Sequence, residues 1–142
     1  MRFALGSDAT GEAPDAIERA LRERGHEVER CGALAPGQPA GWADVAHDVA
    51  ARVASGAADQ GVLFCWTGTG VSIAANKVPG IRAALCADGE TARGSRAWND
   101  ANVLCLSLRT TTPALALEII EAWLAAAVDE SEREQIDRVE GG

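Results

Sequence analysis

The sequence predicts an α/β fold: a single-domain, doubly wound (Rossmann-like), five-stranded parallel sheet with helices on both faces. Short apolar runs of strand length alternate along the chain with longer segments of helical periodicity. Glycine and proline mark most of the boundaries, and the connections are long enough for the right-handed crossovers that parallel strands need. With 142 residues, 47% of them hydrophobic, the chain can bury one substantial core.

The first half of the chain alternates strand and helix. Residues 2–7 form the first expected strand, and Pro14 lies where a first helical turn accepts proline. That helix ends at Gly25, and the charged alternation of residues 27–31 is typical of an edge strand. Residues 32–41 hold two prolines and three glycines, which predicts a loop. The clearest amphipathic helix follows, with apolar residues at i, i+3, i+4, i+7, i+8 and i+11: Trp42, Val45, Ala46, Val49, Ala50 and Val53.

The second half continues the same alternation. Residues 62–65 form a buried strand, followed by a glycine loop and a short helix of small residues. A fourth strand is expected over 81–86, and Asp88 can cap a helix that runs toward Trp98. Residues 103–106 form the fifth strand. The last long helix, from about 113 to 127, has one apolar face: Ala116, Ile119, Ile120, Trp123, Leu124 and Ala127. We therefore assign residues 1–127 to the α/β domain and residues 128–142 to a charged helical tail of the same domain.

The composition restricts the partners. A net charge of -8 argues against binding nucleic acid or an anionic membrane surface, because long-range repulsion opposes both. No apolar run approaches the roughly 18 residues of a membrane span, and the N-terminus has the pattern of a strand rather than of a secretion signal. We expect a soluble, cytoplasmic protein. An anionic ligand would need arginines concentrated at its site.

Cysteine and histidine usage points to free thiols and no metal. The four cysteines have no close pairing and no Cys-x-x-Cys spacing: Cys31, Cys65, Cys86 and Cys105. Free thiols suit a reducing compartment. The only histidines, His26 and His47, fall at expected surface or boundary positions, so we predict no metal site and no cofactor.

The stretch Gly61 to Lys77 carries the candidate chemistry. An apolar strand ends in Cys65, and the loop that follows carries Gly68 and Gly70. Such a turn directs backbone N–H groups toward an anion or a developing oxyanion. Ligands of parallel sheets bind at the carboxyl ends of strands, where several reactive side chains are expected: Asp8, Cys65, Cys86, Asp88 and Arg109. A cysteine here can also be a buried hydrophobe, Asp8 only a turn residue, and Asp88 only a helix cap.

Three chemistries compete for a cysteine before a glycine loop. A low-molecular-weight phosphatase needs Cys-x5-Arg, but the residue at that spacing is Val71. A dinucleotide site needs G-x-G-x-x-G, and the third glycine is missing here. The third chemistry is proton transfer on a sugar phosphate, in which a thiolate moves a proton between neighbouring carbons while loop N–H groups hold the enediolate oxygens. The sequence is compatible with the third.

Six segments of the chain together form a recognisable pattern. They are Gly6-Ser-Asp8, Val53-Ala-Ser-Gly56 with Ala58-Asp59, Cys65-x-Thr-Gly-x-Gly70, Ser72-Ile-Ala-Ala-Asn-Lys77, Gly80-Ile-Arg-Ala-Ala-Leu-Cys86 and Asn99-Asp-Ala-Asn-Val103. In these segments the chain resembles the type B ribose-5-phosphate isomerases and their galactose-6-phosphate isomerase relatives. The match runs in register from Arg2 to about Ala127.

The resemblance implies a role for each matching residue. Cys65 would be the base that shuttles a proton between C1 and C2 of the sugar. Asp8 would bind the sugar, and Asn99 would hold a substrate oxygen. The resemblance also implies a homodimer, which can pair further into a tetramer, with the active site between two subunits. The enediolate would be stabilised by the loop residues Trp66, Thr67, Gly68, Thr69 and Gly70, and the phosphate would be bound by Arg109 and the tail arginines Arg133 and Arg138.

The chain also departs from the family pattern. Ala9 and Trp98 stand where the family usually has histidines, the second of which opens the sugar ring. Trp66 replaces the glycine that usually follows the cysteine. The tail arginines are five residues apart rather than four, so only one of them aligns without a gap.

These departures suggest a substrate that needs no ring opening. A tetrose 4-phosphate has its O4 esterified and cannot close a five-membered ring, so it requires the thiol but not the histidine. Trp66 and Trp98 would add bulk that favours a shorter sugar, although they can equally be packing residues of a dimer interface. The alternative is a non-catalytic sugar-phosphate binder derived from this fold. Cys65 favours the enzyme, because a binder has no use for a thiolate there.

Overall fold

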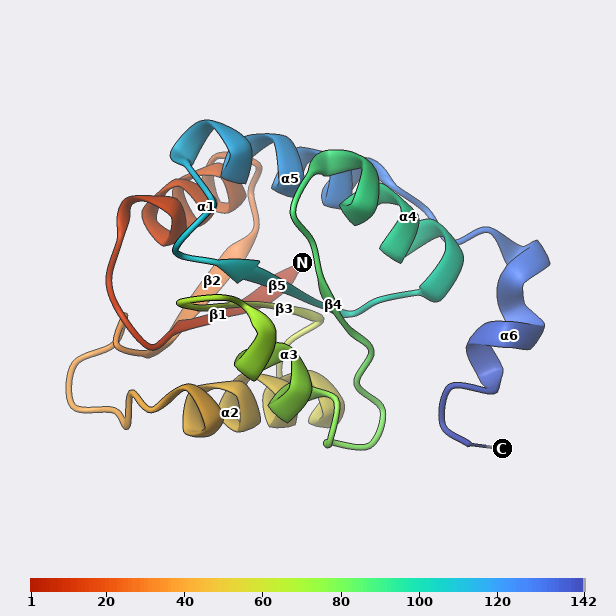
Figure 1. Ribbon diagram of the computed structural model, residues 1–142, viewed down its shortest axis with the longest axis horizontal. Helices are drawn as coiled ribbons and strands as arrows, with labels where there is room; N and C mark the ends of the chain where they lie inside the picture. Colours follow the sequence, from red (N-terminus) through yellow and green to blue (C-terminus); the bar gives the residue numbers. More distant parts are fainter. Residues whose placement is uncertain (142) are drawn as a thin grey trace.

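Five parallel strands form one sheet in the order β2-β1-β3-β5-β4 (Figure 1). The computed structural model describes residues 1–141. The strands are β1 (Arg2–Ser7), β2 (Glu27–Gly32), β3 (Gln60–Cys65), β4 (Ala83–Leu85) and β5 (Val103–Ser107). All neighbouring pairs are parallel, and β2 lies at an edge as its charged alternation predicted. The predicted fold class is confirmed.

Helices cover both faces of the sheet. Figure 1 shows α1, α4 and α5 on one face and α2 and α3 on the other, with α6 set apart beside α4. The bounds are α1 (Glu12–Glu23), α2 (Trp42–Ser55), α3 (Thr69–Ala75), α4 (Gly89–Asn99), α5 (Pro113–Ala125), a 3-10 turn (Glu130–Glu132) and α6 (Arg133–Asp137). Each layer of helices encloses its own apolar cluster. None of the helices within residues 1–141 combines the length and the apolar character that a membrane crossing would need.

The central strand β3 is buried on both faces, and its side chains alternate between the two clusters. Val62 and Phe64 pack on the α1–α5 side, while Leu63 and Cys65 pack on the α2–α3 side. The Cys65 side chain therefore lies on the same face as the helix that follows it.

Three sequence predictions are corrected by the structure. The fourth strand spans Ala83–Leu85 rather than residues 81–86. The backbone N–H groups of Arg82 and Ala83 donate to the side chains of Asn102 and Asn76 (both 2.8 Å), and pairing with β5 begins only at Ala83. Trp42, assigned to the buried stripe of α2, is 49% exposed. Ala127 is exposed and lies beyond α5, because the backbone is already extended at Ala126.

Candidate active site

Cys65 lies at the carboxyl end of β3 and is 5% exposed. It lines a pocket of about 280 Å³. The other lining residues come from the end of β1, the start of α2 and the loop after β3: Asp8, Trp42, Trp66, Thr67, Thr69 and Gly70. The structure thus brings most of the predicted thiol-loop residues around one cavity at the expected edge of the sheet.

The loop after Cys65 is held through its carbonyl groups. The Cys65 carbonyl accepts a hydrogen bond from the backbone N–H of Leu108 (2.9 Å), and the Trp66 carbonyl accepts from the N–H of Arg109 (3.0 Å). The buried Ser107 hydroxyl also donates to the Trp66 carbonyl (2.8 Å). The turn after β5 therefore fixes the loop after β3.

The backbone N–H groups of this loop have no hydrogen-bond acceptor in the described protein. Within residues 1–141, the backbone N–H groups of Thr67, Gly68, Thr69 and Gly70 donate no hydrogen bond to the protein. The threonine hydroxyls of the loop lie 2.8 Å apart. A set of unpaired N–H groups beside a thiol can accept an anionic oxygen, which is the requirement for stabilising an enediolate.

The two loop glycines are required by close packing. Gly68 has φ +77°, and a Cβ there would lie 2.6 Å from Leu85 Cδ1 and 3.0 Å from the Leu106 carbonyl carbon. A Cβ on Gly70 would lie 2.8 Å from the Trp42 ring. Any larger side chain would displace the loop or the tryptophan.

Asp8 follows β1 directly, belongs to no helix or strand, and lines the Cys65 pocket. The buried Ser7 hydroxyl accepts a hydrogen bond from the N–H of Ala9 (3.2 Å), which shapes this turn. Partial burial raises the pKa of the Asp8 carboxyl above its ordinary value. The carboxylate is a hydrogen-bond acceptor suited to a sugar hydroxyl.

The remaining thiols are buried away from this pocket. Burial raises the pKa of Cys31 to about 12 and that of Cys86 to about 11, and it raises the pKa of Cys105 as well. All four cysteines are free. Of these four thiols, Cys65 is the one that lines the pocket at the glycine loop.

The histidines do not contribute to the pocket. His26 is partly buried, contacts the N-terminal amine at 2.9 Å and packs edge-on against Phe3. His47 is exposed on α2. Across residues 1–141, no three side chains of the metal-ligating types lie close enough together to share an ion.

Three predicted ligand residues lie elsewhere in the same chain. Asn99, at the end of α4, lines a second pocket of about 450 Å³ that also includes Arg82 and Glu140. Arg133 pairs with Glu130 (3.1 Å), and the tail residue Arg138 pairs with Glu134 (2.6 Å). Arg109 is exposed, and it is joined to the thiol loop through its backbone N–H.

The three tryptophans singled out by the sequence are all exposed, but in two places. Trp42 and Trp66 (65% exposed) line the Cys65 pocket, whereas Trp98 (48% exposed) does not. Its ring stacks against the Arg93 guanidinium, 5.2 Å away, and covers Gly94. Sequence reasoning missed Ser107. The available signal was its position: Ser107 is a polar residue that ends the apolar strand β5 at the carboxyl edge of the sheet.

A parallel α/β sheet with a thiol beside a glycine loop at its carboxyl edge defines a class of small-ligand enzyme site. A family model described as Ribose/Galactose Isomerase matches residues 3–140. The chain belongs to this family, and it is an enzyme of the sugar-phosphate isomerase class.

Individual relatives cover nearly the whole chain. It is 40% identical over 135 residues to "Ribose-5-phosphate isomerase B" of Escherichia coli, covering 94% of this chain and 90% of the relative. It is 38% identical over 127 residues to "D-erythrulose-4-phosphate isomerase" of Pectobacterium atrosepticum, covering 89% and 84%. The solved structure of Clostridium thermocellum ribose-5-phosphate isomerase B superposes with a TM-score of 0.90 at 38% identity, covering 99% of this chain and 96% of that one. The predicted resemblance is confirmed.

Proposed function

We propose that this enzyme interconverts an aldose phosphate and a ketose phosphate, with the thiolate of Cys65 carrying the proton. The observation that supports this most directly is the position of the Cys65 side chain in a pocket beside unpaired loop N–H groups. The thiolate takes the proton from C2 of the aldose, and the C–H electron pair forms the C1–C2 double bond of an enediolate. The thiol proton exchanges with solvent, and the thiol then protonates C1. A hydroxyl proton passes from O2 to O1, so aldose and ketose differ only in the positions of two protons.

The loop and Asp8 are assigned to binding. Loop N–H groups from Trp66 to Gly70 would hold the enediolate oxygens, where negative charge develops during the reaction. The Asp8 carboxylate would accept a hydrogen bond from a sugar hydroxyl. Arg109 would supply positive charge for the phosphate.

A short, open-chain tetrose phosphate is the substrate we favour. Ala9 and Trp98 supply no imidazole for opening a sugar ring. Trp42 and Trp66 border the pocket and add bulk there. One relative at 38% identity is named as an isomerase of D-erythrulose 4-phosphate, which agrees with this choice of chain length.

We further propose that the site is completed by a second copy of the chain in a homodimer, which can pair into a tetramer. Asn99, Arg133 and Arg138 do not line the Cys65 pocket of their own chain. A two-fold dimer would bring these groups of one subunit to the pocket of the other. The exposed tryptophans at the pocket, with Ile73 (62% exposed) on α3, supply the apolar surface that such an interface needs.

The test is solvent-deuterium incorporation at C1 or C2, followed by NMR. D-erythrose 4-phosphate, erythrulose 4-phosphate and ribose 5-phosphate are each incubated with the wild type, with Cys65→Ala and with Cys86→Ala. We expect exchange with the tetroses that falls by about 100- to 10,000-fold in Cys65→Ala. Cys86→Ala removes another buried thiol, one that does not line the Cys65 pocket, and is the matched control.

Each other outcome has a definite meaning. Faster exchange with ribose 5-phosphate than with the tetroses would contradict the substrate assignment while leaving the role of Cys65 intact. Undiminished exchange in Cys65→Ala would remove the thiolate from the mechanism. Binding of all three sugars without exchange in the wild type would identify the protein as a sugar-phosphate binder.

A further inference from the structure

Asp100 has an unusual backbone for its residue type. It follows α4 directly and has φ 48° and ψ 44°, the only positive φ outside glycine among residues 1–141. Aspartate tolerates this left-handed conformation better than most residues, but the conformation still costs free energy relative to a helical one. It persists where the surroundings hold the residue in place.

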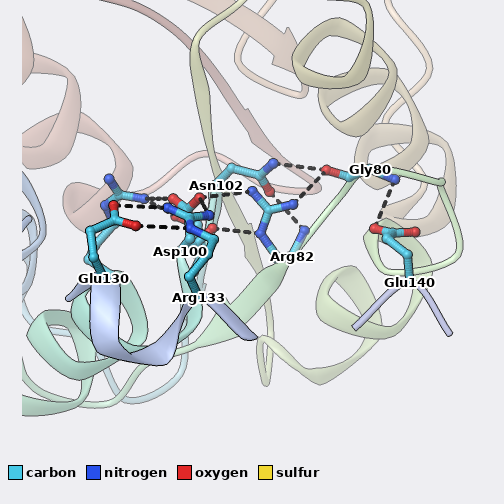
Figure 2. Close-up of polar contacts among 9 residues, drawn as sticks. Gly80, Arg82, Asp100, Asn102, Glu130, Arg133 and Glu140 are labelled. Carbon is cyan, nitrogen blue, oxygen red and sulfur yellow. Dashed lines mark hydrogen bonds and ion pairs between the residues drawn. The ribbon is translucent and has the colours of Figure 1, made fainter. Parts of the chain in front are cut away.

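Those surroundings are three arginines from three different parts of the chain (Figure 2). The Asp100 carboxylate lies 3.1 Å from Arg96 of α4, 3.5 Å from Arg82 before β4 and 3.5 Å from Arg133 of α6. The Asp100 carbonyl also accepts a hydrogen bond from Arg82 Nε (2.8 Å). Its side chain is 25% exposed, so these contacts are partly shielded from solvent.

The C-terminal tail (residues 128–141) also contacts this cluster of Asp100 and the three arginines at a second point. The Glu140 side chain, beyond the end of α6, accepts a hydrogen bond from the Gly80 N–H (3.2 Å). The Gly80 carbonyl in turn accepts from the side chain of Asn102 (3.0 Å), whose oxygen accepts from the Arg82 N–H. Figure 2 shows these contacts as one continuous set that runs from Glu130 to Glu140.

Asp100 is the contact that fixes the direction of the Arg133 side chain relative to the body of the protein. The other carboxylate partner of Arg133 is Glu130, three residues earlier in the same tail, so that pair moves with the tail. The helix that carries Arg133 has only five residues and one buried side chain, Ile136. Without Asp100, little else would hold the guanidinium in one orientation.

This set of contacts holds as many carboxylates as guanidinium groups. The guanidinium groups are those of Arg82, Arg96 and Arg133, and the carboxylates are those of Asp100, Glu130 and Glu140. A phosphate would therefore be recognised by the directed N–H groups of an arginine held in place, and not by a local excess of positive charge.

We propose that Asp100 is a positioning residue for phosphate recognition: it orients Arg133, and through its backbone it sets the neighbouring Asn99. This inference rests on the proposed function, in which both groups are delivered to the sugar phosphate at the partner subunit. Asp100 itself does not touch the substrate. It raises affinity by holding the arginine in its binding orientation before the ligand arrives.

The test compares steady-state kinetics of the full-length wild type, Asp100→Asn, Arg133→Ala and the double variant. Asparagine keeps the size of the side chain and tolerates the left-handed backbone, but it removes the charge. We expect KM for the sugar phosphate to rise about tenfold in Asp100→Asn with kcat changed by less than about twofold, which is the pattern of lost binding. The inhibition constant of inorganic phosphate should rise by the same factor. Because Asp100 acts through Arg133, the double variant should bind no more weakly than Arg133→Ala alone.

Two further variants serve as controls, one for specificity and one for folding. Glu90→Gln removes another carboxylate of α4, one that pairs with Arg93 (2.6 Å) and not with Arg133, and it should leave KM unchanged. Asp100→Gly removes the carboxylate while accepting the positive φ without strain, so it reports on the contact even if Asp100→Asn folds poorly.

The outcomes separate the inference from the proposed function. Suppose that the wild type is active and that Arg133→Ala binds the sugar phosphate weakly. If both Asp100 variants then keep the wild-type KM and the wild-type inhibition constant of phosphate, the positioning role of Asp100 is overturned and the proposed isomerase function is not. Fully additive effects in the double variant would also overturn it. If the wild type turns over no sugar phosphate, the proposed function fails, and the inference fails with it.

Discussion

The thiol corner and the arginine corner of this molecule are built by different means. The thiol corner comprises Asp8 and residues 65–70, and its shape comes from a strand end, a glycine with positive φ and carbonyls held by the neighbouring turn. The arginine corner comprises Asn99, Asp100 and Arg133, and it depends on ion pairs between segments distant in sequence. The first corner holds the group suited to moving a proton, and the second holds guanidinium N–H donors suited to an anion.

The difference suggests a division of labour between two subunits. Neither corner alone has both the Cys65 thiol and the clustered arginines, and the pockets at the two corners share no lining residue. A two-fold arrangement would join the thiol corner of one chain to the arginine corner of its partner.

The largest expected effect tests this pairing by complementation. Cys65→Ala lacks the base and Arg133→Ala lacks a phosphate ligand, so each homodimer has two defective sites. When the two inactive or weakened proteins are mixed and allowed to exchange subunits, each heterodimer contains one site with both residues intact. Random exchange then restores about a quarter of the wild-type activity at low substrate concentration.

The control is a mixture of Cys65→Ala with a Cys65→Ala/Arg133→Ala double variant, in which no site can regain the thiol. It should stay inactive. If the two single variants exchange subunits and still regain no activity, the thiol corner of one subunit and the arginine corner of the other do not form one active site.

The second prediction concerns the backbone of the thiol corner. Gly68→Ala combines the strain of positive φ with a clash against Leu85 and the Leu106 backbone, so we expect the free energy of unfolding to fall by about 2–4 kcal/mol. Gly37→Ala is the matched control, because Gly37 has φ +75° with no atom within 4 Å of its would-be Cβ and suffers only the strain, about 1–2 kcal/mol. Urea denaturation measures both. Equal decreases in the free energy of unfolding would show that Leu85 and the Leu106 backbone can shift to accommodate a Cβ at residue 68.

The thiol corner could be predicted from sequence because its determinants are local. The apolar run ending in Cys65 and the two glycines after it specify a strand, a tight loop and a helix start without reference to the rest of the chain. The helix cap at Asp88 was predictable for the same reason, and its side chain accepts from the Thr91 N–H (2.8 Å). The contribution of Ser107 was missed because it depends on the register between β3 and β5.

The arginine corner could not be assembled from sequence. Arg82, Arg96 and Arg133 are spread over more than fifty residues, and nothing in their spacing indicates that all three meet at Asp100. The exposure of Trp42 was missed for a related reason: its periodicity places it on the apolar stripe, but it lies at the first residue of α2, beyond the sheet and over Gly70.

The smallest expected effect is on stability, at Asp8. Since burial raises the pKa of this carboxyl in the folded protein, the folded state holds the proton to a higher pH than the unfolded chain does. Stability therefore falls as the pH rises from the ordinary pKa of aspartate through the raised pKa of the folded state. Asp8→Asn removes this penalty and should raise Tm by about 1–2 °C at pH 7, with no difference at pH 3, while raising KM for the sugar.

Asp88→Asn provides a control of opposite sign. The Thr91 N–H lowers the pKa of the Asp88 carboxyl, so its charge favours the folded state above the ordinary pKa of aspartate, and that contribution is lost as the pH falls through the lowered pKa. Its substitution should lower Tm slightly at pH 7. Thermal melts of both variants across pH 3 to 8 decide the matter. A fall in Tm for Asp8→Asn at pH 7 would mean that Asp8 is a structural turn residue whose charge stabilises the fold, which would weaken its assignment to the sugar.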